Sequence, residues 1–152
     1  MTTKRGRARA PRLVEKALVD LLGAADRVKA AMAAVVEPYG ITAQQYNVLR
    51  ILRGAGPEGL PTLAIAERML ERSPGITRMI DRLEAKGLVT RERRANDRRC
   101  VDCRITAAGS RLLAELDEPV DEADAAAFAT LNRTELRQLT ALLERVQPEN
   151  ST

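Results

Sequence analysis

Apolar residues recur every three to four positions between Leu13 and Pro38, and this spacing predicts one long amphipathic helix. A second apolar stripe begins after Thr106 and continues into a last helix, whose start is marked by Asn132. These stripes are longer than the short segments between them can cover. We therefore expect both ends of the chain to pair with the same helices of a second copy.

The middle of the chain alternates short helical patterns with turn signals. Thr42 opens one helix with a capping box, and Pro61 begins a shorter one. Ser73 and Pro74 mark a third helix start, because serine accepts hydrogen bonds from free amides and proline fits the first helical position. Gly87 is expected to end that helix. The pattern therefore predicts three helices in succession, followed by a change of periodicity.

Alternating apolar and polar residues then predict a β-hairpin from 88–93 and 100–105, joined by a polar turn. Cys100 and Cys103 lie three positions apart on the second strand, so their side chains point to opposite faces, about 10 Å apart. That geometry excludes a disulfide or a shared metal site. Cys103 is expected in the core. Cys100 lies beside two arginines that could lower the pKa of its thiol, which leaves open a regulator that responds through this thiol.

A short helix, a turn, a capped helix with a polar outer face and a basic hairpin form the layout of a winged helix-turn-helix. We therefore expect a mostly α fold with a small β-hairpin. The capped helix suits the major groove of B-DNA, and the arginine-rich hairpin suits the neighbouring minor groove. The predicted parts are a flexible basic arm (1–12), an N-terminal dimerisation helix (13–41), a winged helix-turn-helix DNA-binding lobe (42–106) and C-terminal dimerisation helices (107–152).

The outer face of the third helix and the hairpin turn supply the candidate DNA contacts. Arg78 and Thr77 are expected to read base edges, because they lie near the helix start on its polar face. Arg82 and Lys86 either contact phosphate or pair with acidic residues of the same helix. The candidates are Ser73, Pro74, Thr77, Arg78 and Arg82 on the recognition helix, and Arg94, Asn96, Asp97, Arg98 and Arg99 in the wing.

The composition favours nucleic-acid binding over catalysis. The formal net charge is +4, and basic residues predominate up to residue 106, whereas the remaining segment is acidic. The chain has no histidine, which removes the commonest general base and the commonest imidazole metal ligand. Asp97 has no partner base, so we expect it to pair with Arg99 and hold the shape of the wing. We expect no enzymatic activity, no cofactor and no metal.

No apolar run approaches the roughly 20 residues that a membrane span needs. The first 11 residues are basic and contain no apolar stretch of the kind found in a secretion signal. We therefore expect a soluble, cytoplasmic protein that does not associate with membranes.

One stretch of the sequence carries a resemblance to a known family. Residues 73–89 read SPGITRMIDRLEAKGLV and are followed by Asp97-Arg98-Arg99 and by ITAAG at 105–109. In this order and spacing they resemble the MarR family of bacterial transcription regulators, over about residues 13 to 146. The resemblance implies that the terminal helices interlock two subunits, and that a ligand pocket lies between them and the DNA-binding lobe. Family members that sense thiols or metals use a cysteine in the first helix or histidine ligands, which this chain lacks.

We therefore expect a homodimeric transcription regulator that binds a pseudo-palindromic operator in double-stranded DNA, as a repressor released by a small-molecule effector. The alternative is a helical protein-interaction module that binds protein through its winged helix. Tyr39 and Tyr46 either line the effector pocket or pack at the helix junction. Packing is the expectation, because amphipathic rings are common at such junctions.

Overall fold

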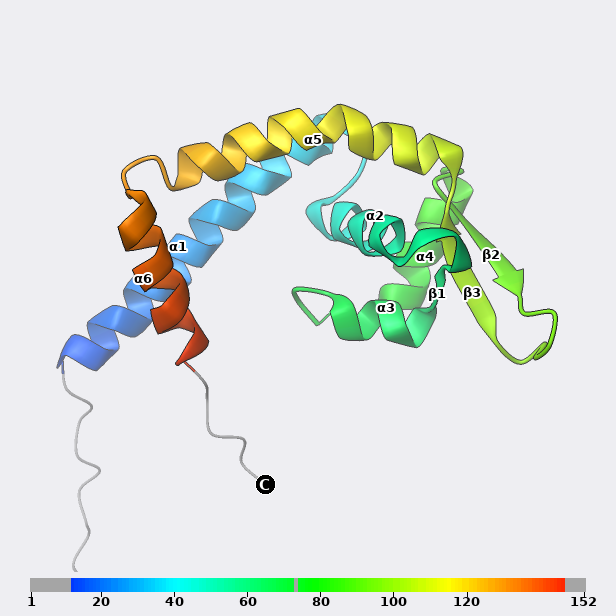
Figure 1. The fold of residues 1–152 in the computed structure, drawn as a ribbon, viewed down its shortest axis with the longest axis horizontal. Helices are drawn as coiled ribbons and strands as arrows, with labels where there is room; N and C mark the ends of the chain where they lie inside the picture. The colour runs from blue at the N-terminus through cyan, green and yellow to red at the C-terminus, as the bar shows by residue number, and fades with distance from the viewer. Residues whose placement is uncertain (1–11, 73, 147–152) are drawn as a thin grey trace, which may run out of the picture.

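The chain folds into an elongated arm and a smaller lobe (Figure 1). The computed structural model describes residues 12–72 and 74–146. The arm consists of α1 (Arg12–Val36), α5 (Ala107–Ala127) and α6 (Arg133–Glu144). Helices α1 and α5 pack against each other, and α6 follows at the end of the arm far from the lobe (Figure 1). The long helices predicted near both ends of the chain are therefore confirmed.

Side-chain caps fix the helix starts that the sequence predicted. The Thr42 hydroxyl accepts a hydrogen bond from the Gln45 N–H, and the Gln45 side chain accepts one from the Thr42 N–H, both at 3.1 Å. Asn132 and Glu135 form the same reciprocal arrangement before α6. The Thr106 hydroxyl caps α5. Each cap satisfies amide groups that would otherwise lack a partner in the first turn.

The lobe places three helices against a small sheet. Its elements are α2 (Ala43–Ala55), β1 (Leu60–Pro61), α3 (Thr62–Arg68), α4 (Ile76–Ala85), β2 (Val89–Arg93) and β3 (Val101–Ile105), with short 3-10 helices at Glu37–Tyr39 and Gly56–Glu58. Leu49, Ile65, Ile80 and Leu83 are fully buried between them. The same core continues under the start of α5 through Leu113.

The sheet has three antiparallel strands in the order β1-β3-β2, whereas the sequence predicted only the β2-β3 hairpin. In the added strand, Leu60 lies opposite Cys103 and Pro61 opposite Asp102. A proline is tolerated there because β1 is an edge strand. Gly59 precedes it with a φ of +70°, and a Cβ at this position would collide with the Cys103 carbonyl oxygen. Only glycine therefore lets β1 approach β3 so closely.

Some element boundaries differ from the prediction. Helix α4 begins at Ile76 and not at Pro74, because Gly75 occupies the N-cap position without a side-chain cap, and a glycine inside a helix costs about 1 kcal/mol relative to alanine. The predicted cap, Ser73, lies outside the described residues. Helix α3 begins one residue later than predicted, because Pro61 belongs to β1. Helix α1 includes residue 12, and the rest of the predicted flexible arm lies outside the described residues.

The arm is attached to the lobe at a close contact near the start of α5. A Cβ built on Gly109 would lie 2.5 Å from the Leu88 carbonyl oxygen and 2.7 Å from Ile105 Cγ1, so the α5 backbone rests directly on the sheet. A second attachment lies further along α5, where Arg53 Nη1 and Nη2 each donate to the Asp117 carboxylate at 2.9 Å. These contacts join α5 to the sheet and to α2.

The arm leaves many large apolar side chains exposed, whereas the lobe exposes fewer, among them Leu63 and Leu70. They cluster in the first half of α1, at the end of α5, and in or just after α6. The exposed residues there are Leu13, Val14, Leu18, Val19, Leu22, Phe128, Leu142, Leu143 and Val146. The described residues of the chain do not cover this surface.

Candidate nucleic-acid interface

The recognition helix α4 buries one face and exposes the other. Met79, Ile80 and Leu83 are buried against the lobe, while Thr77 and Arg78 are exposed on the predicted reading face. An exposed side chain near the start of such a helix can reach base edges in the major groove.

The acidic residues of α4 do not pair with its own basic residues. Asp81 and Glu84 both face Arg91 of β2, with Arg91 Nη2 bonded to Asp81 Oδ1 and Arg91 Nη1 lying 3.8 Å from Glu84 Oε2. Within residues 12–72 and 74–146, neither Arg78 nor Arg82 has an ion-pair partner. Of the two alternatives raised for Arg82, pairing inside the helix is therefore absent.

Lys86, the other residue left open, belongs to the fold. Its ammonium group donates to the Gly40 carbonyl oxygen and lies 3.4 Å from Gln45 Oε1. Gly40 lies in the turn before α2, and Gln45 lies in the first turn of α2. Lys86 therefore ties the end of α4 to the base of the lobe, and its charge is already engaged.

The wing is the loop between β2 and β3, and an arginine-aspartate pair braces its base. Arg94 Nε donates to Asp102 Oδ2 at 2.6 Å, and Arg94 Nη2 donates to Asp102 Oδ1 at 2.9 Å. Asp102 is buried, and the hydrogen bond from Arg94 is the main cause of the lowered pKa of its carboxyl group. Arg94 is therefore already bonded to Asp102 within the wing. To contact DNA as predicted, its guanidinium group would have to share or break the bonds to Asp102.

Asp97 shapes the tip of the wing, although not through the side chain that was expected. Its Oδ1 accepts a hydrogen bond from the Arg99 backbone N–H at 3.0 Å, and its Oδ2 lies 3.5 Å from the Cys100 thiol. The Arg99 guanidinium makes no ion pair in the described part of the chain. A carboxylate that accepts from a backbone amide two residues on forms a turn of the Asx type. Asn96 and Arg98 are exposed beside it.

The two cysteines differ in burial and in what raises the pKa of the thiol. Cys103 is fully buried, as predicted, and burial raises the pKa of its thiol. Cys100 is half-buried, and its hydrogen bond to Asp97, together with the negative charge of that carboxylate, also raises its pKa. The sequence left open that the arginines beside Cys100 lower its pKa. The pKa is raised instead, because the contact with the Asp97 carboxylate has the largest influence on the thiol.

The two tyrosines lie at the junction of α1 and α2. Tyr46 is buried, which raises its pKa, and the Arg50 guanidinium carbon lies 5.8 Å from the centre of its ring. Tyr39 is exposed to 39%. Tyr46 therefore packs at the helix junction, as expected. It also contributes to the wall of a cavity.

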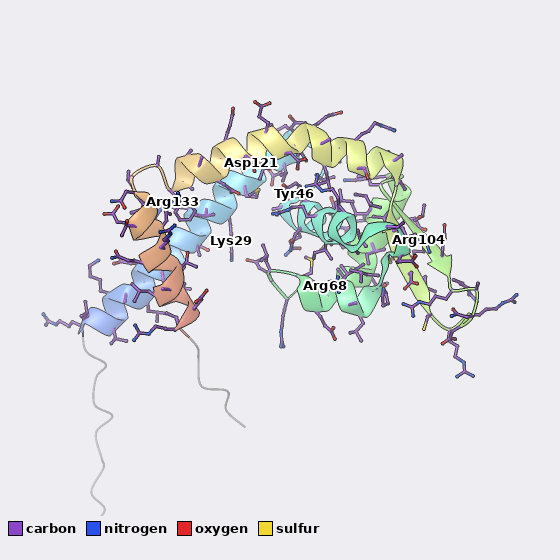
Figure 2. The ribbon with its side chains drawn as sticks, in the orientation of Figure 1. Lys29, Tyr46, Arg68, Arg104, Asp121 and Arg133 are labelled. Carbon is purple, nitrogen blue, oxygen red and sulfur yellow. The ribbon has the colours of Figure 1, made fainter. Side chains whose placement is uncertain are left out.

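That cavity has a volume of about 380 Å³ and lies between α1, α2 and the segment that follows α3. Figure 2 labels two of its lining residues, Lys29 on α1 and Tyr46 on α2. Its apolar wall consists of Val28, Met32, Ala43, Tyr46, Met69 and Leu70, and its polar wall of Lys29, Gln44, Asn47, Arg50 and Glu71. Lys29 and Glu71 form an ion pair that links the arm to the lobe at this cavity.

In the described ranges, no helix is both long and apolar enough to cross a membrane. In the same ranges, no three residues of the metal-ligating types Cys, Asp and Glu come together in a group that could hold an ion.

Comparison with known proteins identifies relatives over most of the chain. The model of the MarR family matches residues 41–101. The HTH-type transcriptional regulator FarR of Neisseria gonorrhoeae is 31% identical over 82% of this chain and 84% of its own length. The homoprotocatechuate degradative operon repressor of Escherichia coli is 29% identical over 83% of this chain and 84% of the relative.

Solved structures agree with the sequence relatives. A MarR transcription factor from Planctomyces limnophilus has a TM-score of 0.68 at 39% identity, covering 93% of this chain and all of that one. The Staphylococcus aureus MepR–DNA complex has a TM-score of 0.74 at 25% identity, covering 86% of this chain and 93% of that one. The winged helix-turn-helix predicted from the sequence is thereby confirmed, and the chain belongs to the MarR family of DNA-binding transcription regulators.

Proposed function

We propose that this protein is a homodimeric repressor that binds a pseudo-palindromic operator and is released from it by a small-molecule effector. One observation carries the DNA-binding part of the proposal. In the described part of the chain, Arg78, Arg82 and Arg98 have no carboxylate partner, whereas Arg91 and Arg94, which lie between them, are both engaged. These three unpaired guanidinium groups lie on the recognition helix and at the wing tip.

This distribution suits a division of labour on DNA. Arg78 lies in the first turn of α4, where its fork of donors can reach guanine O6 and N7. Arg98 and Arg99 at the wing tip suit the negative potential of the minor groove or the neighbouring phosphates. Thr77 supports base contact beside Arg78. Pro74 lies at the helix entrance, where phosphate would approach free backbone amides.

The exposed apolar face of the arm supports dimerisation. Leucine and valine side chains on α1 and α6 would lose contact with water if the same helices of a second copy packed over them. Contact between identical surfaces produces a two-fold axis, and two recognition helices related by such an axis read a site with two related halves. The pseudo-palindromic operator follows from this symmetry.

The cavity between α1, α2 and the segment after α3 is the proposed effector site. Its volume of about 380 Å³ suits a small organic molecule. The Lys29 ammonium is already paired with Glu71, so Arg50 is the cation that favours a ligand with a negative charge or hydrogen-bond acceptors. Met69, Leu70 and Glu71 lie in the segment that leads into α4, so a ligand that displaces them shifts the entrance of the recognition helix.

We assign the protein no catalytic role and no thiol sensor. The chain has no histidine, and the Asp97 carboxylate is already occupied by donors of the wing. The raised pKa of the Cys100 thiol leaves little of the reactive thiolate at neutral pH.

Selection of bound sites from random double-stranded DNA tests the proposal. We expect an enriched sequence with two inverted halves, bound by two chains, and located beside a promoter. Transcription from that promoter should rise when the protein is removed. Enrichment of no sequence, with DNA affinity that follows only the arginine content, would instead favour the protein-interaction module.

A further inference from the structure

We propose that Arg91 is a positioning residue for sequence reading, which holds the recognition helix at a fixed orientation to the wing. The inference rests on the proposed function, because it concerns how α4 and the wing engage the same operator. Arg91 itself makes no contact with bases in this proposal. It acts through Asp81 and Glu84.

Arg91 projects from the middle of β2 onto α4. Its Nη2 is bonded to the Asp81 carboxylate and lies 3.5 Å from the Thr77 carbonyl oxygen, while its Nη1 lies 3.8 Å from Glu84 Oε2. These three acceptors occupy positions i, i+4 and i+7 of the helix, which lie above one another on a single face. One side chain from the sheet therefore spans two turns of the recognition helix.

The covalent joint between α4 and the sheet is short and rests on a glycine. Gly87, with a φ of +70°, forms the turn, and the Leu88 N–H donates to the Leu83 carbonyl oxygen at 3.0 Å. The buried side of the joint is packed by Leu83. Arg91 supplies polar contacts on the more exposed side, its own side chain being 27% exposed. With contacts on both sides, the helix has one preferred angle to the wing.

That angle matters for selectivity more than for affinity. Base reading requires donors within hydrogen-bond distance of particular base edges while the wing is anchored elsewhere on the duplex. A helix free to rock would keep its attraction for phosphate and lose its register on the bases.

The test compares Arg91→Gln, Asp81→Asn and the double variant on the selected operator and on a scrambled duplex, each over a range of salt concentrations. We expect each single variant to lower the ratio of operator affinity to scrambled affinity about tenfold, and the double variant to lower it no further. For Asp81→Asn the expectation is sharp, because removing a negative charge from the DNA-facing helix should hold or raise affinity for the scrambled duplex. The salt dependence should change by less than about half an ion.

Glu92→Gln is the matched control. Glu92 lies next to Arg91 on β2 and pairs with Arg104 at 2.8 Å, away from α4. This variant also removes one carboxylate from an ion pair, and it should leave the affinity ratio unchanged. Arg91→Lys should retain part of the ratio, because a lysine ammonium can hold Asp81 but cannot span both carboxylates as the guanidinium does.

Three results would overturn the inference. If Arg91→Gln weakens both duplexes equally and reduces the salt slope by about one ion, Arg91 contacts phosphate. If the variants lower the melting temperature but keep the ratio, the ion pair only stabilises the fold. If Arg91→Gln fails to fold, Asp81→Asn decides, and an unchanged ratio there rejects the proposal. A wild-type protein that shows no operator preference rejects the proposed function instead, so the two failures are distinct.

Discussion

The lobe and the arm of this molecule use their apolar residues in opposite ways. In the lobe, Leu49, Ile80 and Leu83 are fully buried within the chain itself. In the arm, Leu18 and Leu22 of α1 are 56% and 57% exposed, although they belong to an equally regular apolar stripe. Sequence periodicity identifies both as helix faces that must be covered. The structure shows which of them the chain covers alone and which it leaves for another surface.

The same contrast divides the arginines of the lobe and wing. Arg53, Arg91 and Arg94 each have a carboxylate within the chain. In the described ranges, Arg78 and Arg98 have none. A partner inside the chain assigns a side chain to the fold, and its absence leaves that side chain available to an external ligand such as DNA.

The arm should show the largest effect. If a second copy covers it, Leu18→Glu removes one apolar contact from each subunit, at a cost of about 3 to 6 kcal/mol, which is a 100-fold to 10,000-fold rise in the dimer Kd. Sedimentation equilibrium measures this rise. Leu63→Glu is the control, because Leu63 is 71% exposed on α3 and lies in the lobe. Equal behaviour of the two variants would remove the distinction between arm and lobe.

The lobe should respond through its own stability. Leu49 is fully buried, so Leu49→Ala should lower the free energy of unfolding by about 2 to 5 kcal/mol. Denaturant titration at one fixed protein concentration measures the loss. At concentrations where Leu18→Glu sediments as a monomer, folded Leu49→Ala should still sediment as a dimer. A shift of Leu49→Ala to monomers would show that the two regions are not separable.

Arg78 and Arg98 separate base reading from general attraction. Arg78→Ala should weaken operator binding by about 1 to 3 kcal/mol and leave affinity for scrambled DNA nearly unchanged. Arg98→Ala should weaken both duplexes and lower the salt slope by about one ion. Salt titrations of both variants on both duplexes supply the comparison. Equal losses on the two duplexes for Arg78→Ala would make it a phosphate contact.

The brace at the base of the wing predicts a pH dependence. Because the pKa of Asp102 is lowered in the folded protein, the pair with Arg94 stabilises the wing at neutral pH, and that contribution disappears as the pH falls through the lowered pKa. Asp102→Asn should therefore be less stable than the wild type at pH 7. The difference should shrink in acid. Thermal unfolding of both proteins across this range measures it, and a constant difference would assign the effect to packing.

The smallest effect is expected at Cys100. Because Asp97 raises the pKa of the thiol, mild peroxide should leave operator binding unchanged in the wild type and in Cys100→Ser alike. Binding assays before and after treatment test this, with mass spectrometry to identify oxidised residues. A wild-type loss of binding that Cys100→Ser abolishes would restore the thiol-responsive alternative.

Local chemistry explains what the sequence could predict. Thr42 with Gln45, and Asn132 with Glu135, meet within one helical turn, so their spacing is sufficient to predict both helix starts. The hairpin of β2 and β3 is likewise local. Strand β1 was missed because two residues show no alternation, and its pairing with β3 depends on contacts some 40 residues away.

Long-range pairing also explains what was missed at the site. Arg91 and Asp81 lie ten positions apart on different elements, and no periodicity within either element reveals their contact. Asp102 alternates as an outward strand residue, yet it is buried because Arg94 and the neighbouring edge strand enclose it. The DNA contacts predicted for Thr77, Arg78, Arg82, Arg98 and Arg99 remain predictions, and the variants above test those of Arg78 and Arg98.

The close contact between α5 and the sheet at Gly109 affects how the arm and the lobe can move relative to each other. Because the α5 backbone rests against the Leu88 carbonyl oxygen with no side chain between them, and Arg53 holds Asp117 further along the same helix, α5 meets the lobe at two separated points. Two separate contacts keep α5 from rotating relative to the lobe. We therefore expect a rotation of the arm to change the orientation of the sheet, and the wing at the end of that sheet to move with it.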